Sequence, residues 1–365
     1  MTPPKLTVRN IRAVGVKVPM TYVLGTSQEA LREAPLLLVD LETEEGVTGH
    51  AYQFCYVPAA AAAIVVMLDE VLRTVKGDRV EPAALWTKLA KRFVLMGVQG
   101  IVRMAMAAFD VAAWDAVARA AGMPLASCLG GTPRAVPAYN SCGLGLKDDP
   151  AAVADEAQKL LAGGFRAIKL RLGYPTLEAD LAVARAVRSR IPAGISVMVD
   201  YNQALAVEEA IRRGRALECE GIYWIEEPIP HDDYAGCAEI ARALSTPVQI
   251  GENFSLVHDM ERALAAKSCD CVMPDLERIG GVTGWRRAAE LAAAKGIRMS
   301  SHLYPEVSAH LLAVTPTAHW LEYVDWANAV LEEPLRIADG NAVLSSRPGN
   351  GLAWNEDAVR RYRMS

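Results

Sequence analysis

The 365-residue sequence lacks the features that mark a membrane, secreted or nucleic-acid-binding protein. Its most hydrophobic run, residues 59–68, is shorter than the ~20 residues of a membrane span and is predicted to form a buried helix. No apolar segment follows a basic one near residue 1, so no secretory signal is predicted and a cytoplasmic location is expected. The net charge is −5 and no basic run is present, which argues against nucleic acid as a partner.

The cysteines lack the spacing patterns that bind metal or form disulfide frameworks. The seven cysteines form an odd set without a CxxC pair, which is typical of reduced thiols in the cytosol. Cys269 and Cys271 form a CxC, but no second cysteine or histidine pair lies at zinc-site spacing. Both cysteines are therefore predicted to pack in the core.

From about residue 136 the chain alternates between short β-rich runs and longer amphipathic stretches. This alternation predicts parallel βα units. Successive runs begin 21 to 31 residues apart, the length of one strand, one helix and two loops. The eight runs are residues 136–142, 167–172, 196–202, 221–228, 247–253, 270–275, 298–304 and 319–325. They predict an α/β fold with a closed (β/α)8 barrel.

The remaining residues are predicted to form other units. Residues 1–130 contain two strand candidates, 6–19 and 35–54, followed by helical sequence, and are assigned to a separate α+β domain. The barrel is assigned residues 131–340. A further strand candidate follows, so residues 341–365 are expected to return to the first domain.

Carboxylates lie at the ends of three consecutive predicted strands. Asp200 ends the third, Glu226 the fourth and Glu252 the fifth, at the end of the barrel where active sites are built. Left alone they would repel one another, so a divalent cation is expected, and all-oxygen ligation favours Mg²⁺ over zinc. The alternative is that each acid caps a helix or pairs with a surface arginine.

Asp275 and His302 end the sixth and seventh strands. A carboxylate that holds one ring nitrogen fixes the tautomer and raises the basicity of the other, which makes His302 a candidate general base. The other histidines, at positions 50, 231, 258, 310 and 319, are interpreted as packed core residues. Glu322 ends the eighth strand. Kept neutral by an apolar site, Glu322 could donate a hydrogen bond to an oxyanion, or it could form a helix cap or salt bridge.

Two cations share one face of the second strand, because Lys169 and Arg171 are two residues apart. They are predicted to face the acidic mouth from the opposite side. There they could bind a substrate carboxylate, one of them could act as a base, or they could simply neutralise the acidic cluster.

With these residues in place, the sequence resembles the enolase superfamily, and specifically its mandelate racemase subgroup, over nearly its full length. The matching strings are VDYNQAL, WIEEP, GEN, MPD followed by RIGGVTGW, and MSSHLYPEVSAHLLAVTPTAHWLE. The resemblance implies that Asp200, Glu226 and Glu252 bind Mg²⁺ and that His302 and Asp275 form the catalytic dyad. The chemistry shared by the family is removal of the proton α to a carboxylate, which gives an enediolate held by Mg²⁺.

The resemblance also implies roles around a small carboxylate substrate. Glu322 would hydrogen-bond to the substrate carboxylate. Ser141 and Asn202 match positions that contact the α-hydroxyl and the carboxylate, and Lys169 matches the first lysine of a K-x-K motif that neutralises that carboxylate. The first domain resembles the family's capping domain, in which a loop and the segment near Tyr56 close over the barrel. A homo-oligomer is also implied.

Two departures from the family pattern bear on the reaction. Arg171 stands where racemases carry the second lysine as a base, and a guanidinium gives up its proton far less readily than an ammonium. The cap loop carries polar residues where apolar ones are expected for an aromatic substrate. These residues are Gln28, Glu29, Arg32 and Glu33.

Three functions remain open from the sequence. The long match to mandelate racemase favours racemisation or epimerisation of a 2-hydroxy acid. Arg171 favours an acid-sugar dehydratase that uses His302 as its single base. A catalytically silent, metal-binding relative is the third alternative.

Overall fold

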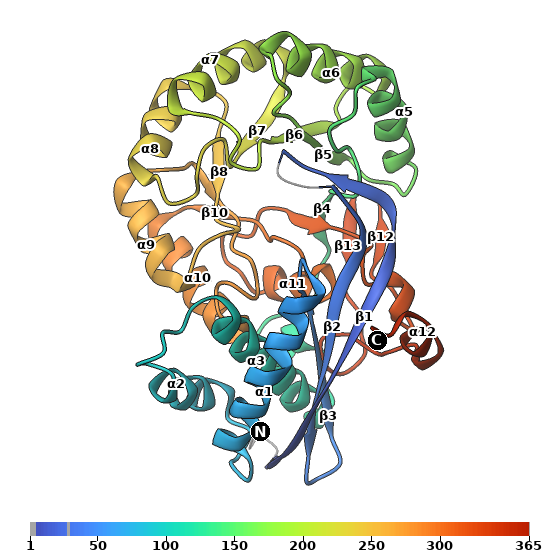
Figure 1. Cartoon of the computed structure of the whole chain (residues 1–365), viewed down its shortest axis with the longest axis vertical. Coiled ribbons are helices and arrows are strands. Elements are labelled where there is room, and N and C mark those ends of the chain that lie inside the picture. The colour runs from blue at the N-terminus through green and yellow to red at the C-terminus, as the bar shows by residue number, and fades with distance from the viewer. Residues whose placement is uncertain (1–4, 28–29, 365) are drawn as a thin grey trace.

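A ring of parallel strands surrounded by helices forms the larger part of the computed structural model, which describes residues 5–27 and 30–364 (Figure 1). In these residues each of the eight predicted runs contains a strand. The strands are β4 (Val136–Asn140), β5 (Ala167–Arg171), β6 (Ser196–Asp200), β7 (Ile222–Glu226), β8 (Val248–Ile250), β9 (Cys271–Val272), β10 (Arg298–Met299) and β11 (Leu321–Tyr323).

Parallel pairing joins the ring in the order β11-β4-β5-β6-β7-β8-β9-β10. The last step is completed outside the regular ladder, where the Met299 amide donates to the Thr317 carbonyl and the His319 amide donates to the Met299 carbonyl, both at 2.9 Å. The predicted (β/α)8 barrel is therefore confirmed.

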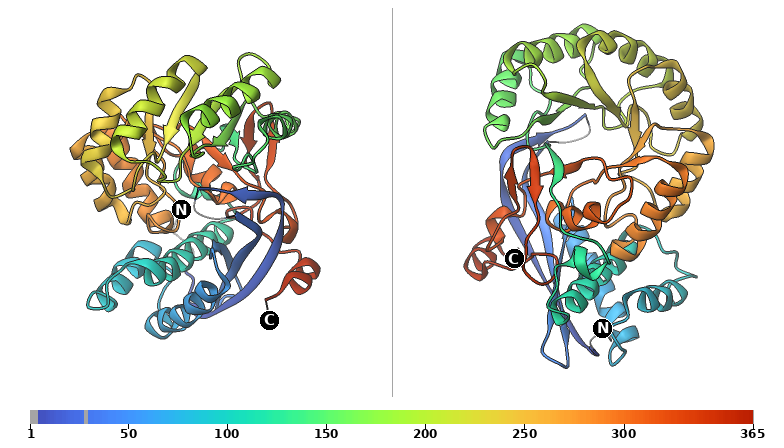
Figure 2. Two further views of the ribbon diagram at one scale, coloured as in Figure 1. Left: turned by 45° about the horizontal axis from the view of Figure 1, so that its top comes forward. Right: turned by 180° about the vertical axis from the view of Figure 1, so that it is seen from behind.

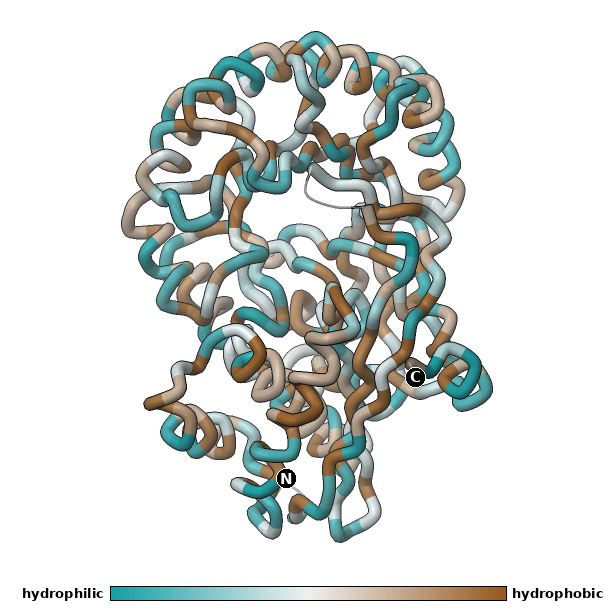
Figure 3. The backbone as a smooth tube through the Cα atoms, in the orientation of Figure 1, coloured by the Kyte–Doolittle hydropathy of each residue, from teal (hydrophilic) through white to brown (hydrophobic). Residues whose placement is uncertain are grey.

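Helices cover the outside of the ring, and the sequence defines several of their ends. Asp149 and Thr176 cap the helices that follow β4 and β5, because their side chains accept hydrogen bonds from backbone amides at 2.9 and 3.2 Å. Along most of these helices, hydrophobic residues recur between hydrophilic ones, so that one face packs on the strands (Figure 3). The helices are α5 (Pro150–Leu161), α6 (Leu177–Arg190), α7 (Val207–Leu217), α8 (Tyr234–Ala243), α9 (Leu256–Ala266), α10 (Gly281–Lys295) and α11 (Pro305–Ala313).

The first domain, called the cap below, packs an antiparallel sheet against helices. Its elements are β1 (Val8–Gly25), β2 (Ala30–Thr43), β3 (Thr48–Phe54), α1 (Pro58–Val75), α2 (Pro82–Arg92), α3 (Gly100–Ala120) and α4 (Leu125–Cys128). The candidate strand 35–54 is in fact a hairpin, because Gly46 adopts a φ of 82° that turns the chain between β2 and β3. The helix predicted at residues 59–68 forms within α1, but only one of its faces is buried: Ile64 and Leu68 lie in the core, whereas Val66 is 61% exposed.

The β1–β2 hairpin reaches from the cap to the barrel (Figures 1 and 2). Its end meets the loop after β4, where the Leu146 amide donates to the Gly25 carbonyl at 3.1 Å. Ser27 donates its hydroxyl to the carbonyls of Tyr201 and Asn202, both at 3.2 Å. The hairpin thereby covers one side of the barrel mouth.

The C-terminal residues contact both domains. The predicted strand in the tail is β13 (Asn341–Val343), which pairs with β12 (Arg336–Ala338) and, antiparallel, with β4 of the barrel. Beyond it, Asn350 donates to the His50 carbonyl of the cap at 2.8 Å. After α12 (Glu356–Tyr362), the Met364 amide donates to the Gly15 carbonyl of β1 at 2.8 Å.

The remaining sequence-based expectations have mixed outcomes. Cys269 and Cys271 are free and buried, as predicted. Of the histidines interpreted as core residues, His310 is buried, whereas the side chain of His258 is 82% exposed because it lies on the solvent face of α9. No helix in the described part of the chain is both long and apolar enough to span a membrane.

Candidate active site

Three carboxylates converge at the barrel mouth. Asp200 and Glu226 are the last residues of β6 and β7, and Glu252 follows β8 by two residues. One oxygen of each lies within 4.8 Å of the others, a grouping that could hold a metal ion. Because parallel strands end at the same rim, the spacing of the βα units alone brings these residues together.

Lys169 of β5 lies in the middle of this acidic group. Its Nζ is 2.6 Å from Glu226, 2.7 Å from Glu322 and 3.2 Å from Asp200. Burial lowers the pKa of Lys169, but the negative charges of these partners raise it well above its usual value. The side chain is therefore a fixed cation, and these contacts agree with the neutralising role considered from the sequence.

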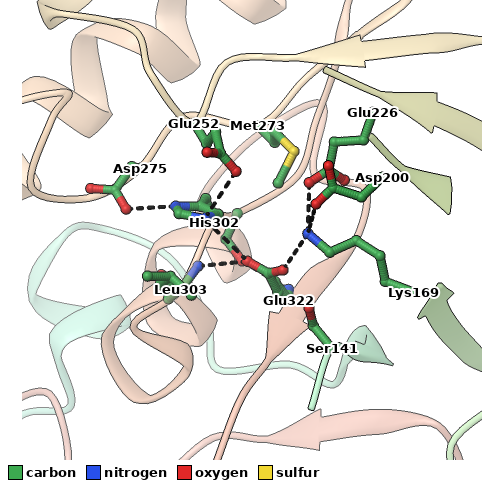
Figure 4. Close-up of polar contacts among 12 residues, drawn as sticks. Ser141, Lys169, Asp200, Glu226, Glu252, Met273, Asp275, His302, Leu303 and Glu322 are labelled. Atoms are coloured by element: carbon green, nitrogen blue, oxygen red, sulfur yellow. Dashed lines mark hydrogen bonds and ion pairs between the residues drawn. The ribbon is translucent and has the colours of Figure 1, made fainter. Parts of the chain in front are cut away.

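His302 and Asp275 lie on the other side of Glu322 from Lys169 (Figure 4). The Nδ1 atom of His302 is 2.7 Å from Asp275 Oδ2, while Nε2 is 3.2 Å from Glu252 Oε2. Burial lowers the pKa of His302, but the charges of Glu252 and Glu322 and the bond to Asp275 raise it to about 9. Asp275 thus holds Nδ1 and leaves Nε2 on the cavity side.

Glu322 is ionised, contrary to the expectation that an apolar site keeps it neutral. Burial raises its pKa, but the charges of Lys169 and His302, with the hydrogen bond from Lys169, lower it to about 2. Its other oxygen accepts from the Leu303 amide at 2.9 Å. In this arrangement Glu322 accepts hydrogen bonds and does not donate one.

Arg171 is buried beside Lys169 but has different partners. Its guanidinium donates to the Gly143 carbonyl at 2.7 Å and to the carbonyl and hydroxyl oxygens of Ser141, both at 3.3 Å. None of its described hydrogen-bond partners is a carboxylate. Arg171 therefore lines the same cavity as Lys169 while fixing the loop that follows β4.

A cavity of about 240 Å³ lies above these groups, between barrel and cap. Asn202 and Tyr56 line it, in agreement with the expectation that they face a substrate. Ser141 is fully buried and bonded to Arg171, and it is absent from the described residues that line the cavity.

The cap contributes both apolar and polar residues to this cavity, among them Leu24, Thr26 and Tyr56. Leu31 lines the cavity, whereas Arg32 and Glu33 are exposed outside it. Glu33 pairs with Lys17 at 2.7 Å. The predicted lid residues Gln28 and Glu29 lie outside the described residues.

Comparison with known families decides the assignment. Residues 8–130 match the N-terminal domain of the mandelate racemase / muconate lactonizing enzyme family, and residues 152–358 match the enolase C-terminal domain-like family. The chain belongs to the enolase superfamily.

Similar proteins in this superfamily are dehydratases and cycloisomerases. The L-talarate/galactarate dehydratase of Salmonella typhimurium is 32% identical over 93% of this chain and 85% of its own length. An enolase from alpha proteobacterium bal199, crystallised with magnesium, is 44% identical with a TM-score of 0.96 over 98% of this chain and 100% of its own. A Bradyrhizobium enolase complexed with magnesium and mandelic acid is 39% identical, with a TM-score of 0.94 over 100% of both chains. The chain is thus an enolase-superfamily enzyme of the isomerase or lyase type.

Two residues that line this enolase-superfamily site, Arg278 and Asn253, were not predicted from the sequence patterns. Arg278 donates to the Tyr56 hydroxyl at 2.7 Å and to the Glu252 carbonyl at 3.1 Å, and it also contacts Asn253 Oδ1. It connects the cap to a carboxylate-bearing loop of the barrel. The signal was present, because Asn253 belongs to GEN and Arg278 to RIGGVTGW, but no chemistry was assigned to either residue.

Proposed function

We propose that this enolase-superfamily enzyme is a Mg²⁺-dependent dehydratase, which removes the proton α to the carboxylate of a 2,3-dihydroxy acid and expels the 3-hydroxyl as water. The supporting observation is that the His302–Asp275 dyad lies on one side of the site and that Lys169 and Arg171 lie on the other. His302 presents Nε2 to the cavity, while the carboxylate partners of Lys169 raise its pKa well above its usual value and Arg171 is bonded to the Gly143 carbonyl. A single base suits elimination from one face of the substrate.

The carboxylates of Asp200, Glu226 and Glu252 would hold Mg²⁺, because an all-oxygen set of three carboxylates within 4.8 Å fits a hard divalent cation. When bound, Mg²⁺ would polarise the substrate carboxylate and stabilise the negative charge that develops on it. Lys169 supplies a further positive charge at the same place, held by the salt bridges described above.

The proton route follows from the dyad. Asp275 fixes the proton on Nδ1, so Nε2 of His302 accepts the proton from C2. The carboxylates of Glu252 and Glu322 stabilise the imidazolium that results. His302 then donates this proton to the 3-hydroxyl as the C3–O bond breaks, water leaves, and the enol becomes a 2-keto acid.

Racemisation or epimerisation of a 2-hydroxy acid is the second candidate. The apolar cap residues that line the cavity and the Bradyrhizobium relative crystallised with mandelic acid favour it. It requires a proton acceptor on the face opposite His302. The positions available there carry Lys169, whose carboxylate partners raise its pKa well above its usual value, and Arg171, a guanidinium and hence a poor proton acceptor, so elimination is preferred.

A screen of 2-hydroxy and 2,3-dihydroxy acids in D2O with Mg²⁺ tests the proposal. Formation of a 2-keto acid in step with loss of substrate is expected, and deuterium uptake at C2 with inversion but without keto acid would establish racemisation instead. His302→Asn should abolish both signals, whereas His258→Asn on the exposed face of α9 should change neither. Exchange that persists in His302→Asn would refute the assignment of the base.

A further inference from the structure

One part of the cavity lining, called the wall below, is apolar. Cap residues Leu24, Leu31 and Phe54 form it together with Trp326, which follows β11. Phe54 packs on Trp326 with ring centroids 4.7 Å apart and on Tyr56 at 4.5 Å. Packing from both sides fixes these rings, so the wall is a preformed apolar surface.

Polar groups that line the same part of the cavity are bonded within the protein. Arg278 donates to Tyr56, Glu252 and Asn253. Asn253 donates in turn to Glu227 at 2.8 Å and to Glu252 at 3.2 Å. The side-chain carbonyl oxygen of Gln203 accepts from the His231 amide at 3.0 Å. Arg278, Asn253 and the side-chain carbonyl oxygen of Gln203 thus already have partners within the protein.

The apolar wall and the bonded polar groups together determine which kind of substrate binds well. A polyhydroxy chain placed against the wall would lose hydrogen bonds to water without replacing them, which weakens binding. A hydrocarbon group would instead leave water for an apolar surface, which strengthens binding. A cavity of about 150 Å³ already holds benzene, so a volume of about 240 Å³ accommodates one ring or a short branched chain in addition to a carboxylate arm.

We propose that the cavity takes acids whose distal end is a single aromatic ring or a short branched hydrocarbon, rather than the hydroxylated chain of a sugar acid. The inference rests on the proposed function, and it defines the substrate as a 2,3-dihydroxy acid with a hydrocarbon group on C3. The reaction class is then the same as that of the dehydratase relatives, whereas the distal group of the substrate differs from the hydroxylated chain of a sugar acid.

Binding tests the inference independently of turnover. Calorimetry with Mg²⁺ present compares 3-phenyllactate and 2-hydroxyisocaproate with gluconate and galactarate. The apolar acids are expected to bind at least about tenfold more tightly. Tighter binding of either sugar acid would overturn the inference, even if that acid is dehydrated. A 2,3-dihydroxy acid with a phenyl group on C3 that binds as tightly but yields neither C2 exchange nor a 2-keto acid would sustain the inference and refute the proposed function.

A matched pair of variants locates the effect at the wall. Leu31 lines the cavity and is only partly buried, so Leu31→Gln is expected to fold, which circular dichroism verifies. It should weaken 3-phenyllactate binding several-fold and leave gluconate binding unchanged or stronger. Val23, on β1 and 37% exposed, is outside the described lining, so Val23→Gln should change neither affinity. An unchanged affinity ratio in Leu31→Gln would contradict the inference.

Discussion

The backbones of Gly25 and Gly145 approach so closely that a Cβ atom on Gly145 would lie 2.6 Å from the Gly25 nitrogen. Gly25 ends β1 of the cap, and Gly145 belongs to the loop after β4 that Arg171 also holds. Only a residue without a side chain at position 145 allows the hairpin to reach the barrel mouth. The position of the apolar wall over the catalytic groups depends on this contact.

Gly145→Ala should therefore displace the hairpin. Forcing a methyl group into a packed contact costs about 1 to 3 kcal/mol, so urea denaturation should show a loss of stability of this order. The same variant should raise KM, because Leu24 and Leu31 move with the hairpin. Gly163→Ala is the control, since its Cβ would contact only the Phe165 ring, at 3.3 Å. Equal behaviour of the two variants would show that the close contact is unimportant.

Asp275→Asn should remove the base without disturbing the loop. The Oδ1 atom of Asp275 accepts from the amides of Glu277 and Arg278 at 2.8 and 3.0 Å, and the Asn carbonyl can keep both bonds. The Asn amide would then donate to Nδ1 of His302, which places the ring proton on Nε2. We expect kcat to fall by about 10²- to 10⁴-fold, with a smaller effect on KM. Asp155→Asn on the surface of α5 should leave kcat unchanged, and a wild-type rate in Asp275→Asn would refute the dyad.

Glu252→Gln should weaken Mg²⁺ binding, because an amide oxygen replaces an anionic donor. Calorimetry with Mg²⁺ alone should show a loss of affinity of at least about tenfold. Glu261→Gln, on the exposed face of α9, controls for a general loss of negative charge. Unchanged affinity in Glu252→Gln would remove this residue from the ligand set.

Asp110 makes stability depend on pH. It lies on α3 and accepts from the Thr283 amide and hydroxyl of α10, at 2.8 and 2.5 Å. Burial raises its pKa to about 7, although the bonds from Thr283 oppose the shift. The folded state therefore binds this proton more tightly than the unfolded chain does. The resulting stabilisation of the folded state is fully present below about pH 4 and is lost as the pH rises through 7.

Urea denaturation at pH 5 and pH 8 checks this sign. At each pH the free energy of unfolding of the wild type is compared with that of Asp110→Asn. The wild type should be less stable relative to this variant at pH 8 than at pH 5. Asn can keep both contacts with Thr283, so the comparison isolates ionisation. A difference that does not change with pH would show that Asp110 does not titrate in this range.

The barrel and its carboxylates could be predicted because they follow from local patterns. Apolar runs at regular spacing specify parallel strands, and parallel strands bring their ends to one rim. Asp200, Glu226, Glu252, Asp275 and His302 each end or follow such a run. The regular number of residues between strands is thus enough to predict that these side chains lie close together, even when no contact between them is known.

The properties that could not be predicted depend on distant parts of the chain. Glu322 is ionised because Lys169, 153 positions earlier in the sequence, lies 2.7 Å away. The direction of Leu31 and Arg32 depends on the irregular pairing between Pro19 and Leu24, which shifts the hairpin register and so decides which residues face the cavity. Arg278 lies in a loop, where no periodicity indicates its partners.

The C-terminal segment restricts how the enzyme can open. Residues 341–364 leave the barrel at β13 and reach β1, where the Met364 amide bonds to Gly15, so the cap is attached to the barrel by two separate stretches of chain. A body held at two places cannot swing freely about one hinge. A rigid-body swing of the whole cap would therefore have to break the contacts of this tail with His50 and Gly15 as well as those between hairpin and barrel.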